Sequence, residues 1–178
     1  MPSLLLHADD ACFVPDDRLA FAHLLTELGL TGDACEGECE YGFWPGKQFL
    51  SLVMFLGCSP HVALDPHEAG ADQSVCRLLM HLYTDVKFLS ARPRPAERCL
   101  HCRTRVKIAE GVPHDSVYNC THCGRSSVVS DLDWRQGAGF GRFFIEISGI
   151  YPHEAVPADK LLDTLRDNSG TQWRYFYC

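Results

Sequence analysis

The sequence contains no apolar run long enough to cross a membrane. Its longest apolar stretch, residues 49–58, has the length of a strand, whereas a membrane-spanning helix needs about 20 predominantly apolar residues. The segment Met1–His7 carries no lysine or arginine, and it lacks the small-residue cleavage site of a secretory signal peptide. We therefore expect a cytoplasmic protein without a membrane partner.

Common catalytic and cofactor motifs are also missing. Gly137, Gly139 and Gly141 alternate with other residues, but they lack the strand before and the helix after that a phosphate-binding glycine loop requires. Neither a Gly-x-Ser-x-Gly elbow nor a His-Glu-x-x-His helix occurs. Whether the protein is an enzyme therefore stays open, and the absence of these signatures favours a non-catalytic protein.

Basic residues are fewer than acidic ones, 16 against 23, and the formal net charge is −7. This balance argues against a general nucleic-acid binder, which needs positive charge to meet the phosphate backbone. The charge is unevenly spread, because residues 92–125 hold seven basic and three acidic side chains. That segment carries +4 and the remainder −11.

Cysteine, by contrast, is abundant, with ten residues in a chain of 178. Four of them form two Cys-x-x-Cys pairs, Cys99 with Cys102 and Cys120 with Cys123, and seventeen residues separate the pairs. Four thiolates at this spacing suit a tetrahedral Zn²⁺. Because four thiolates leave no open coordination position, we expect one structural zinc ion per chain. Two disulfides, or an iron ion held as in a rubredoxin, are the alternatives.

The segment around these cysteines, about residues 97–131, resembles the zinc-ribbon (rubredoxin-like) modules. The second pair is followed by Gly124, which fits the usual pattern, whereas the first is followed by Arg103, where glycine is usual. The resemblance implies a small metal-held module and nothing more specific, because such ribbons occur in nucleic-acid-binding proteins, protein-binding proteins and enzymes. The rest of the chain is not recognised.

Hydrophobic periodicity and helix-stop residues predict the remaining elements. Helices are expected from about residue 15 to Gly29, over 72–84 and over 157–168. Buried strands are expected over 48–57 and 143–147, further strands over 86–89 and 173–178, and residues 31–46 are expected to form a loop. These elements predict an α+β fold with a mixed sheet and about three helices. Residues 1–94 and 132–178 would form one body, into which residues 95–131 are inserted as the zinc ribbon.

A weak internal repeat accompanies these elements. Residues 57–64 and 149–156 share glycine, proline, histidine and alanine at matching positions, each after an apolar segment. This pattern suggests a duplicated unit of strand, turn, helix and strand.

Three functions are compatible with these features. The favoured one is a non-catalytic interaction or adaptor protein that contacts a protein partner through the basic face of the ribbon, made of Arg98, Arg103, Arg105, Lys107 and Arg125. The second is an enzyme that uses His61 and His153 at the duplicated turns together with Glu154, since histidine can act as acid or base near neutral pH. The third is a nucleic-acid binder that uses the same ribbon. The oligomeric state is left open.

Overall fold

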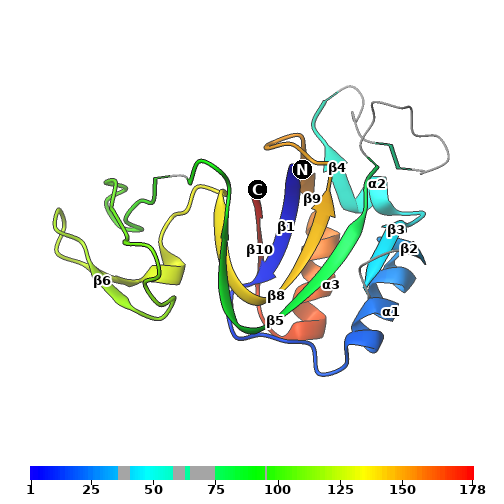
Figure 1. The fold of residues 1–178 in the computed structure, drawn as a ribbon, viewed down its shortest axis with the longest axis horizontal. Helices are drawn as coiled ribbons and strands as arrows, with labels where there is room; N and C mark the ends of the chain where they lie inside the picture. The colour runs from blue at the N-terminus through cyan, green and yellow to red at the C-terminus, as the bar shows by residue number, and fades with distance from the viewer. Residues whose placement is uncertain (36–40, 58–62, 65–74, 95) are drawn as a thin grey trace.

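The centre of the molecule is a six-stranded sheet (Figure 1). The structure, a computed structural model, describes residues 1–35, 41–57, 63–64, 75–94 and 96–178. The strand order is β10-β1-β8-β5-β3-β2, and every ladder in this sheet is antiparallel. The strands are β1 (Ser3–Ala8), β2 (Thr31–Ala34), β3 (Gly42–Pro45), β5 (Leu78–Ser90), β8 (Ala138–Ser148) and β10 (Trp173–Tyr177). The α+β class is confirmed, and the sheet is antiparallel rather than mixed.

Two helices of eleven residues each, α1 (Arg18–Leu28) and α3 (Asp159–Ser169), pack on one face of this sheet. The Asp17 carboxylate caps α1 by accepting hydrogen bonds from the backbone N–H groups of Leu19 and Ala20. Gly29 ends the helix at φ 81°, a left-handed conformation that glycine adopts without steric cost. Both ends of α1 thus follow from residues that the sequence makes visible.

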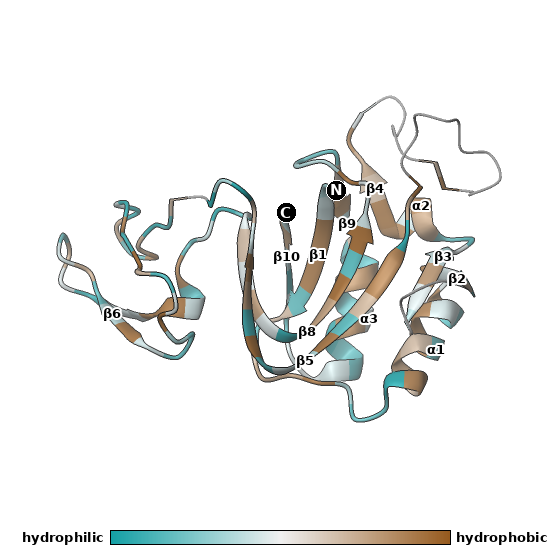
Figure 2. Cartoon of the chain, viewed as in Figure 1, coloured by the Kyte–Doolittle hydropathy of each residue, from teal (hydrophilic) through white to brown (hydrophobic). Residues whose placement is uncertain are grey.

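Alternating side chains of the strands build the main core between the sheet and these helices. The sheet contributes Leu4 and Leu6 from β1 and Ile145 and Ile147 from β8, all fully buried. Figure 2 shows the hydrophobic residues gathered along these strands. All the buried residues of this cluster come from residues 1–94 and 132–178, so the main core needs no side chain from the expected ribbon.

The expected helix over residues 72–84 is wrong. Residues 78–90 form the strand β5, and residues 65–74 lie outside the described part of the chain. The spacing of Val75, Leu78, Leu79 and Leu82 suits a helix, but in the strand Leu78 and Met80 are buried while Leu79 and Leu82 are not. A short leucine-rich run fits both the spacing of a helix and the alternation of a strand, and pairing with the neighbouring strands selects the extended form.

Two other segments also differ from expectation. Residues 48–57 divide into the short helix α2 (Phe49–Leu52) and the strand β4 (Val53–Phe55), because the chain turns at Gln48 before it extends. The segment from 31 to 46, expected as a loop, contains β2 and β3.

The proposed duplication is not borne out in the described residues. The strand β4 pairs with β9 (Ala155–Pro157) in a separate two-stranded sheet. Its supposed counterpart, residues 144–147, lies instead in β8 at the centre of the large sheet. A helix is expected after each of the two repeated turns. After residues 57–64 the chain forms the strand β5 instead, whereas the helix α3 does follow residues 149–156. The four shared residues therefore do not mark equivalent structures, and residues 58–62 of the first turn lie outside the described chain.

The strands β5 and β8 extend beyond the sheet as a two-stranded arm toward the ribbon (Figure 1). Their register shifts between Leu82 and Lys87, which is typical of a bulge that bends a ladder. On the arm, Phe88 and Phe140 lie 4.7 Å apart between ring centroids, and Trp134 packs against both rings. These rings belong to a second hydrophobic cluster that also includes Cys99 and Cys120.

The ribbon contains a short hairpin of β6 (Val117–Asn119) and β7 (Ser126–Val128), followed by a 3-10 turn, η1 (Val129–Asp131). It leaves and rejoins the body at adjacent points, because Arg98 and Asp133 exchange two backbone hydrogen bonds of 3.0 Å. None of the described helices is long and apolar enough to span a membrane.

The division into a body and an inserted ribbon predicts the result of a deletion. Removing residues 95–131 and joining the ends with a short glycine-serine linker should leave a body that unfolds cooperatively, since its core is complete without the ribbon. Circular dichroism during thermal unfolding measures this. A deletion variant carrying Phe88→Ser and Phe140→Ser controls for the apolar rings that the deletion uncovers. Loss of the cooperative transition in both variants would contradict the division.

Candidate metal centre

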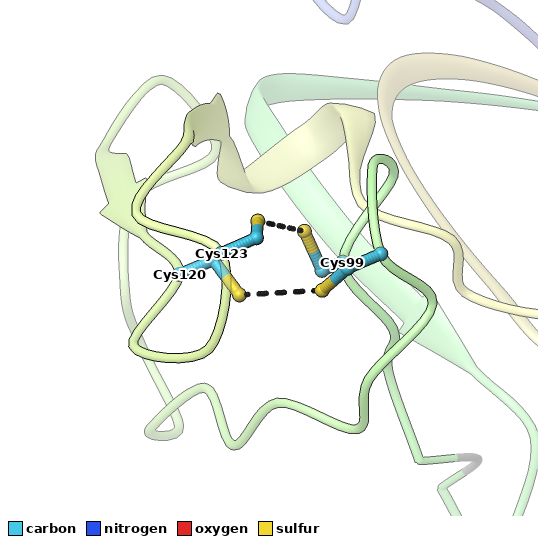
Figure 3. Close-up of side chains that lie close together, drawn as sticks. Cys99, Cys120 and Cys123 are labelled. Atoms are coloured by element: carbon cyan, nitrogen blue, oxygen red, sulfur yellow. Dashed lines mark hydrogen bonds between the residues drawn. The ribbon is translucent and has the colours of Figure 1, made fainter.

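Two tight turns present the four cysteines of the candidate metal centre. In the first, the N–H of Arg103 donates to the carbonyl oxygen of Cys99 at 3.0 Å, and the N–H of Cys99 donates to the carbonyl oxygen of Thr104 at 3.0 Å. These two hydrogen bonds close the turn, and the side chain of Cys99 points across the centre toward that of Cys123 (Figure 3).

The second turn repeats this hydrogen-bond pattern. The N–H of Gly124 donates to the carbonyl oxygen of Cys120 at 2.8 Å, and the N–H of Cys120 donates to that of Arg125 at 2.9 Å. Gly124 has φ 70° and its counterpart Arg103 has φ 61°. The departure from the usual glycine at residue 103 therefore changes the side chain but not the backbone, and Arg103 holds a left-handed conformation that costs a non-glycine residue about 1–2 kcal/mol.

The four sulfur atoms lie at the distances that a tetrahedral metal site requires. All four lie within 4.8 Å of one another. The Sγ atoms of Cys99 and Cys123 are 3.8 Å apart, and those of Cys102 and Cys120 are 3.7 Å apart (Figure 3). A tetrahedron with metal–sulfur bonds of about 2.3 Å has edges of about 3.8 Å, whereas a disulfide bond measures about 2.05 Å. The geometry fits a metal ion and excludes the disulfide alternative for this conformation.

Backbone N–H groups prepare some of these thiols to act as ligands. The N–H groups of Cys102 and His101 point at the Cys99 sulfur and lower the pKa of that thiol. Hydrogen bonds from Thr104, through its hydroxyl and its N–H, lower the pKa of Cys102 to about 5. Thiolates are the metal-binding form of cysteine, so these donors favour metal binding.

The thiol of Cys123, by contrast, does not readily lose its proton while no cation is bound. The N–H of Arg125 lowers the pKa of Cys123, but loss of hydration and the three neighbouring sulfurs outweigh it and raise the value to about 11. A bound divalent cation reverses this effect, because a coordinated thiol is deprotonated. Metal binding must therefore release protons, and the metal affinity should fall as the pH falls.

The centre is enclosed rather than open. Cys99 and Cys120 are buried, Cys102 and Cys123 are half-buried, and the cluster that contains them also includes Val106, Val129 and Leu132. Four protein ligands fill a tetrahedral shell, so no coordination position is left for a substrate or a water molecule. The arrangement can hold a metal ion for structural purposes.

The five basic residues expected to form a contact surface differ in their surroundings. Arg103 forms an ion pair with Asp133 at 3.2 Å, and Arg125 approaches the ring of His101 at 3.4 Å. Arg98 is half-buried, with an Nε atom that has no hydrogen-bond partner among the described residues. The other two, Arg105 and Lys107, are exposed. Four of the five are therefore available on the ribbon surface: Arg103, Arg105, Lys107 and Arg125.

Two of the three residues of the enzyme hypothesis, His153 and Glu154, lie in one turn of the described chain. His61 lies outside the described residues. His153 is exposed, has φ 65° and rests its ring on that of Tyr177 at 5.2 Å between centroids. The Glu154 carboxylate accepts a hydrogen bond from the N–H of Tyr151 at 2.9 Å and so closes the turn in which His153 lies. The contacts of this turn thus suit a role in shaping the backbone.

One polar cluster escaped the sequence analysis. On the face of the sheet opposite the helices, the Glu146 carboxylate accepts a hydrogen bond from the Ser3 hydroxyl at 2.6 Å and contacts the His81 Nε2 atom at 2.6 Å. The contact with His81 is the main cause that lowers the pKa of Glu146. Ser3 touches the carboxylate and not the imidazole, so the group is no nucleophile–base pair. It ties β1, β8 and β5 together across the sheet.

Comparisons of the chain with protein-family models, with curated proteins and with solved structures found no match.

The matching backbone of the two turns predicts that two substitutions differ in their effect on stability. Gly124→Ala should lower the free energy of unfolding by about 1 kcal/mol, because a Cβ atom at φ 70° is strained although nothing else lies within 4 Å of it. Arg103→Gly relieves the same strain and loses an exposed ion pair worth at most about 1 kcal/mol, so stability should stay equal or rise. Thermal unfolding of both metal-loaded variants measures this. Equal destabilisation by the two changes would show that the turns are not equivalent.

Proposed function

We propose that the ion at the four-cysteine centre is zinc, and that it holds the ribbon in a fixed shape without taking part in a reaction. The closed set of four sulfur ligands is the observation that carries this proposal, because structural zinc sites use such sets. Zinc binding by a small module contributes about 10 kcal/mol or more to its folding, so the ribbon would depend on the ion for its structure.

Purified protein should therefore contain one zinc ion per chain, and elemental analysis tests this. Acidification protonates the sulfur ligands, so a chromogenic chelator should remove the zinc far more readily at pH 5 than at pH 8. Cys102→Ser should lower the zinc content sharply, whereas Cys12→Ser, at an exposed cysteine outside the centre, serves as a control and should leave it unchanged. Stoichiometric iron, or no metal under reducing conditions, would contradict the choice of zinc.

We infer further that the protein is a non-catalytic interaction or adaptor protein, with the ribbon as a contact surface for a protein partner. The closed metal centre offers no position for chemistry, and the exposed arginine and lysine side chains of the ribbon contrast with an acidic body. A charged surface of this kind orients an encounter and raises its rate, because complementary charges steer the partner. Packing of the ribbon core on Trp134 and Phe140 supports a fixed orientation of that surface.

Charge reversal tests the role of the ribbon surface. A partner recovered from the native source and identified by mass spectrometry should bind the double variant Arg105→Glu, Arg125→Glu about tenfold more weakly than the original protein, since both exposed side chains would repel an acidic surface. Isothermal titration calorimetry provides the dissociation constants, and zinc content and the unfolding temperature should not change.

The matched control is the double variant Lys47→Glu, Lys160→Glu, which makes the same change of charge at exposed residues of the body. Equal weakening by both double variants would mean that the binding depends on net charge and not on the ribbon. Recovery of a nucleic acid in place of a protein would overturn the choice of partner.

A further inference from the structure

A cavity of about 950 Å³ separates the ribbon from the arm of the body. One wall is the second half of β5, from Thr84 to Ser90, and the opposite wall is the ribbon segment 108–114. A volume of this size lies within the range of ligand-binding clefts. It lies beside the metal centre, and none of the four cysteines lines it.

The strand wall of this cavity presents an unpaired edge. On the side away from β8, β5 pairs with β3 only at Leu78 and Leu79, and among the described residues no strand continues that pairing. The N–H of Ala91 donates to the carbonyl oxygen of Gly137 at 2.8 Å, so this pair faces β8. Hydrogen-bonded pairs alternate along an antiparallel ladder. The backbone groups of Phe88 and Ser90 therefore face the opposite edge.

Within the described chain, the backbone N–H and carbonyl groups of Phe88 and Ser90 have no partner at that edge. Exposed strand edges are sites where an additional extended chain can pair. The edge from Val86 to Ser90 is long enough for about five residues, or roughly 17 Å of extended chain.

The side chains of the cavity indicate what such a chain should carry. Four basic side chains and two acidic ones line it. Arg94 is already engaged, because its Nη2 atom donates to the carbonyl oxygen of Ile108 at 2.7 Å and contacts the Glu97 carboxylate. Lys87 and Arg92 are exposed and form no ion pair with any described residue. They leave positive charge available at the rim.

Aromatic side chains form the apolar part of the lining. Phe88, Trp134 and Phe140 contact one another, with centroid distances of 4.7 to 5.5 Å, and Trp134 and Phe140 are at most 7% exposed. Single-stranded nucleic acids need several open aromatic faces on which bases can stack, and here only the half-buried Phe88 ring is partly open. An extended peptide with apolar and acidic side chains suits the same lining, because one side of a strand can meet the rings while the other meets the rim.

We propose that the cleft between β5 and the ribbon binds an extended acidic segment of the partner protein, which pairs as an added strand with the β5 edge at Phe88 and Ser90. This inference rests on the proposed interaction function and names the class of partner segment. The metal centre has a definite part in it, since residues 108–114 form the second wall only while the ribbon keeps its shape. The added strand gains backbone hydrogen bonds from β5 and orientation from Lys87 and Arg92.

The experiment uses the full zinc-loaded chain and a defined probe, a fluorescent eight-residue peptide that alternates glutamate with valine. Its control alternates lysine with valine, and a thymidine octanucleotide serves as the nucleic-acid probe. Fluorescence anisotropy should show saturable binding of the glutamate peptide to the protein, and no binding of the lysine peptide or the octanucleotide. Hydrogen exchange resolved by NMR should show that this peptide slows exchange of the Phe88 and Ser90 amides and leaves the Leu89 amide, already bonded to β8, unchanged.

Two variants separate the backbone contribution from general effects. Ser90→Pro removes an N–H that faces away from β8, so it should weaken peptide binding about tenfold, whereas Ser90→Ala keeps the N–H and should bind normally. The pair Lys87→Glu, Arg92→Glu should weaken binding and remove the preference for the glutamate peptide. The unfolding temperature of each variant tests whether its fold is kept. If Ser90→Pro does not fold, the protection of the Phe88 and Ser90 amides in the original protein decides whether the peptide pairs with the β5 edge.

The outcomes distinguish this inference from the proposed function. If the ribbon charge reversal weakens binding of the native partner but the peptide neither binds nor protects these amides, the cleft proposal is overturned and the interaction function stands. If the octanucleotide binds and competes for the cleft, the occupant is a nucleic acid and the peptide proposal is wrong. If neither the peptide nor any partner binds, both proposals fail together.

Discussion

The antiparallel ladder between β5 and β8 is the interaction on which the rest of the structure depends. It pairs Leu78 with Ile147 inside the body and Ser90 with Ala138 at the base of the ribbon. The same two strands therefore supply buried residues to the main core and aromatic rings to the second cluster. The ladder, with its register shift between Leu82 and Lys87, ends at the base of the ribbon and so sets where the ribbon is attached to the body.

The features that the sequence reveals are those encoded by neighbours along the chain. The spacing of Cys99, Cys102, Cys120 and Cys123 predicts their cluster because each pair forms one local turn, and the hairpin between the pairs is short. The helix α1 is predictable for the same reason, since Asp17 caps its start and Gly29 ends it. The second Cys-x-x-Cys pair is followed by Gly124, which indicates a left-handed backbone at that residue. The same conformation occurs at Arg103 after the first pair, where no glycine marks it.

Features made by distant residues are invisible at that stage. Ser3, His81 and Glu146 meet only because three strands from separate parts of the chain are neighbours in the sheet. Residues 78–84 of β5 are predicted as a helix because their leucines satisfy a helical spacing, and the residues of β8 that pair with them lie about sixty or more residues away. The cleft beside the ribbon also has two walls with no sequence relation to one another. It could not be found before the fold was known.

The paired backbones of Arg98 and Asp133 have a consequence for the order in which the molecule assembles. They bring together the two points at which the chain enters and leaves the ribbon. The entropy lost when two strands meet grows with the length of chain between them, although slowly. A ribbon that has captured its ion holds these two points side by side and shortens the loop that β5 and β8 must close. Because contacts between residues distant in sequence slow folding, metal capture would speed the zipping of the central strands, and so link the supply of the ion to the rate at which the whole chain reaches its native state.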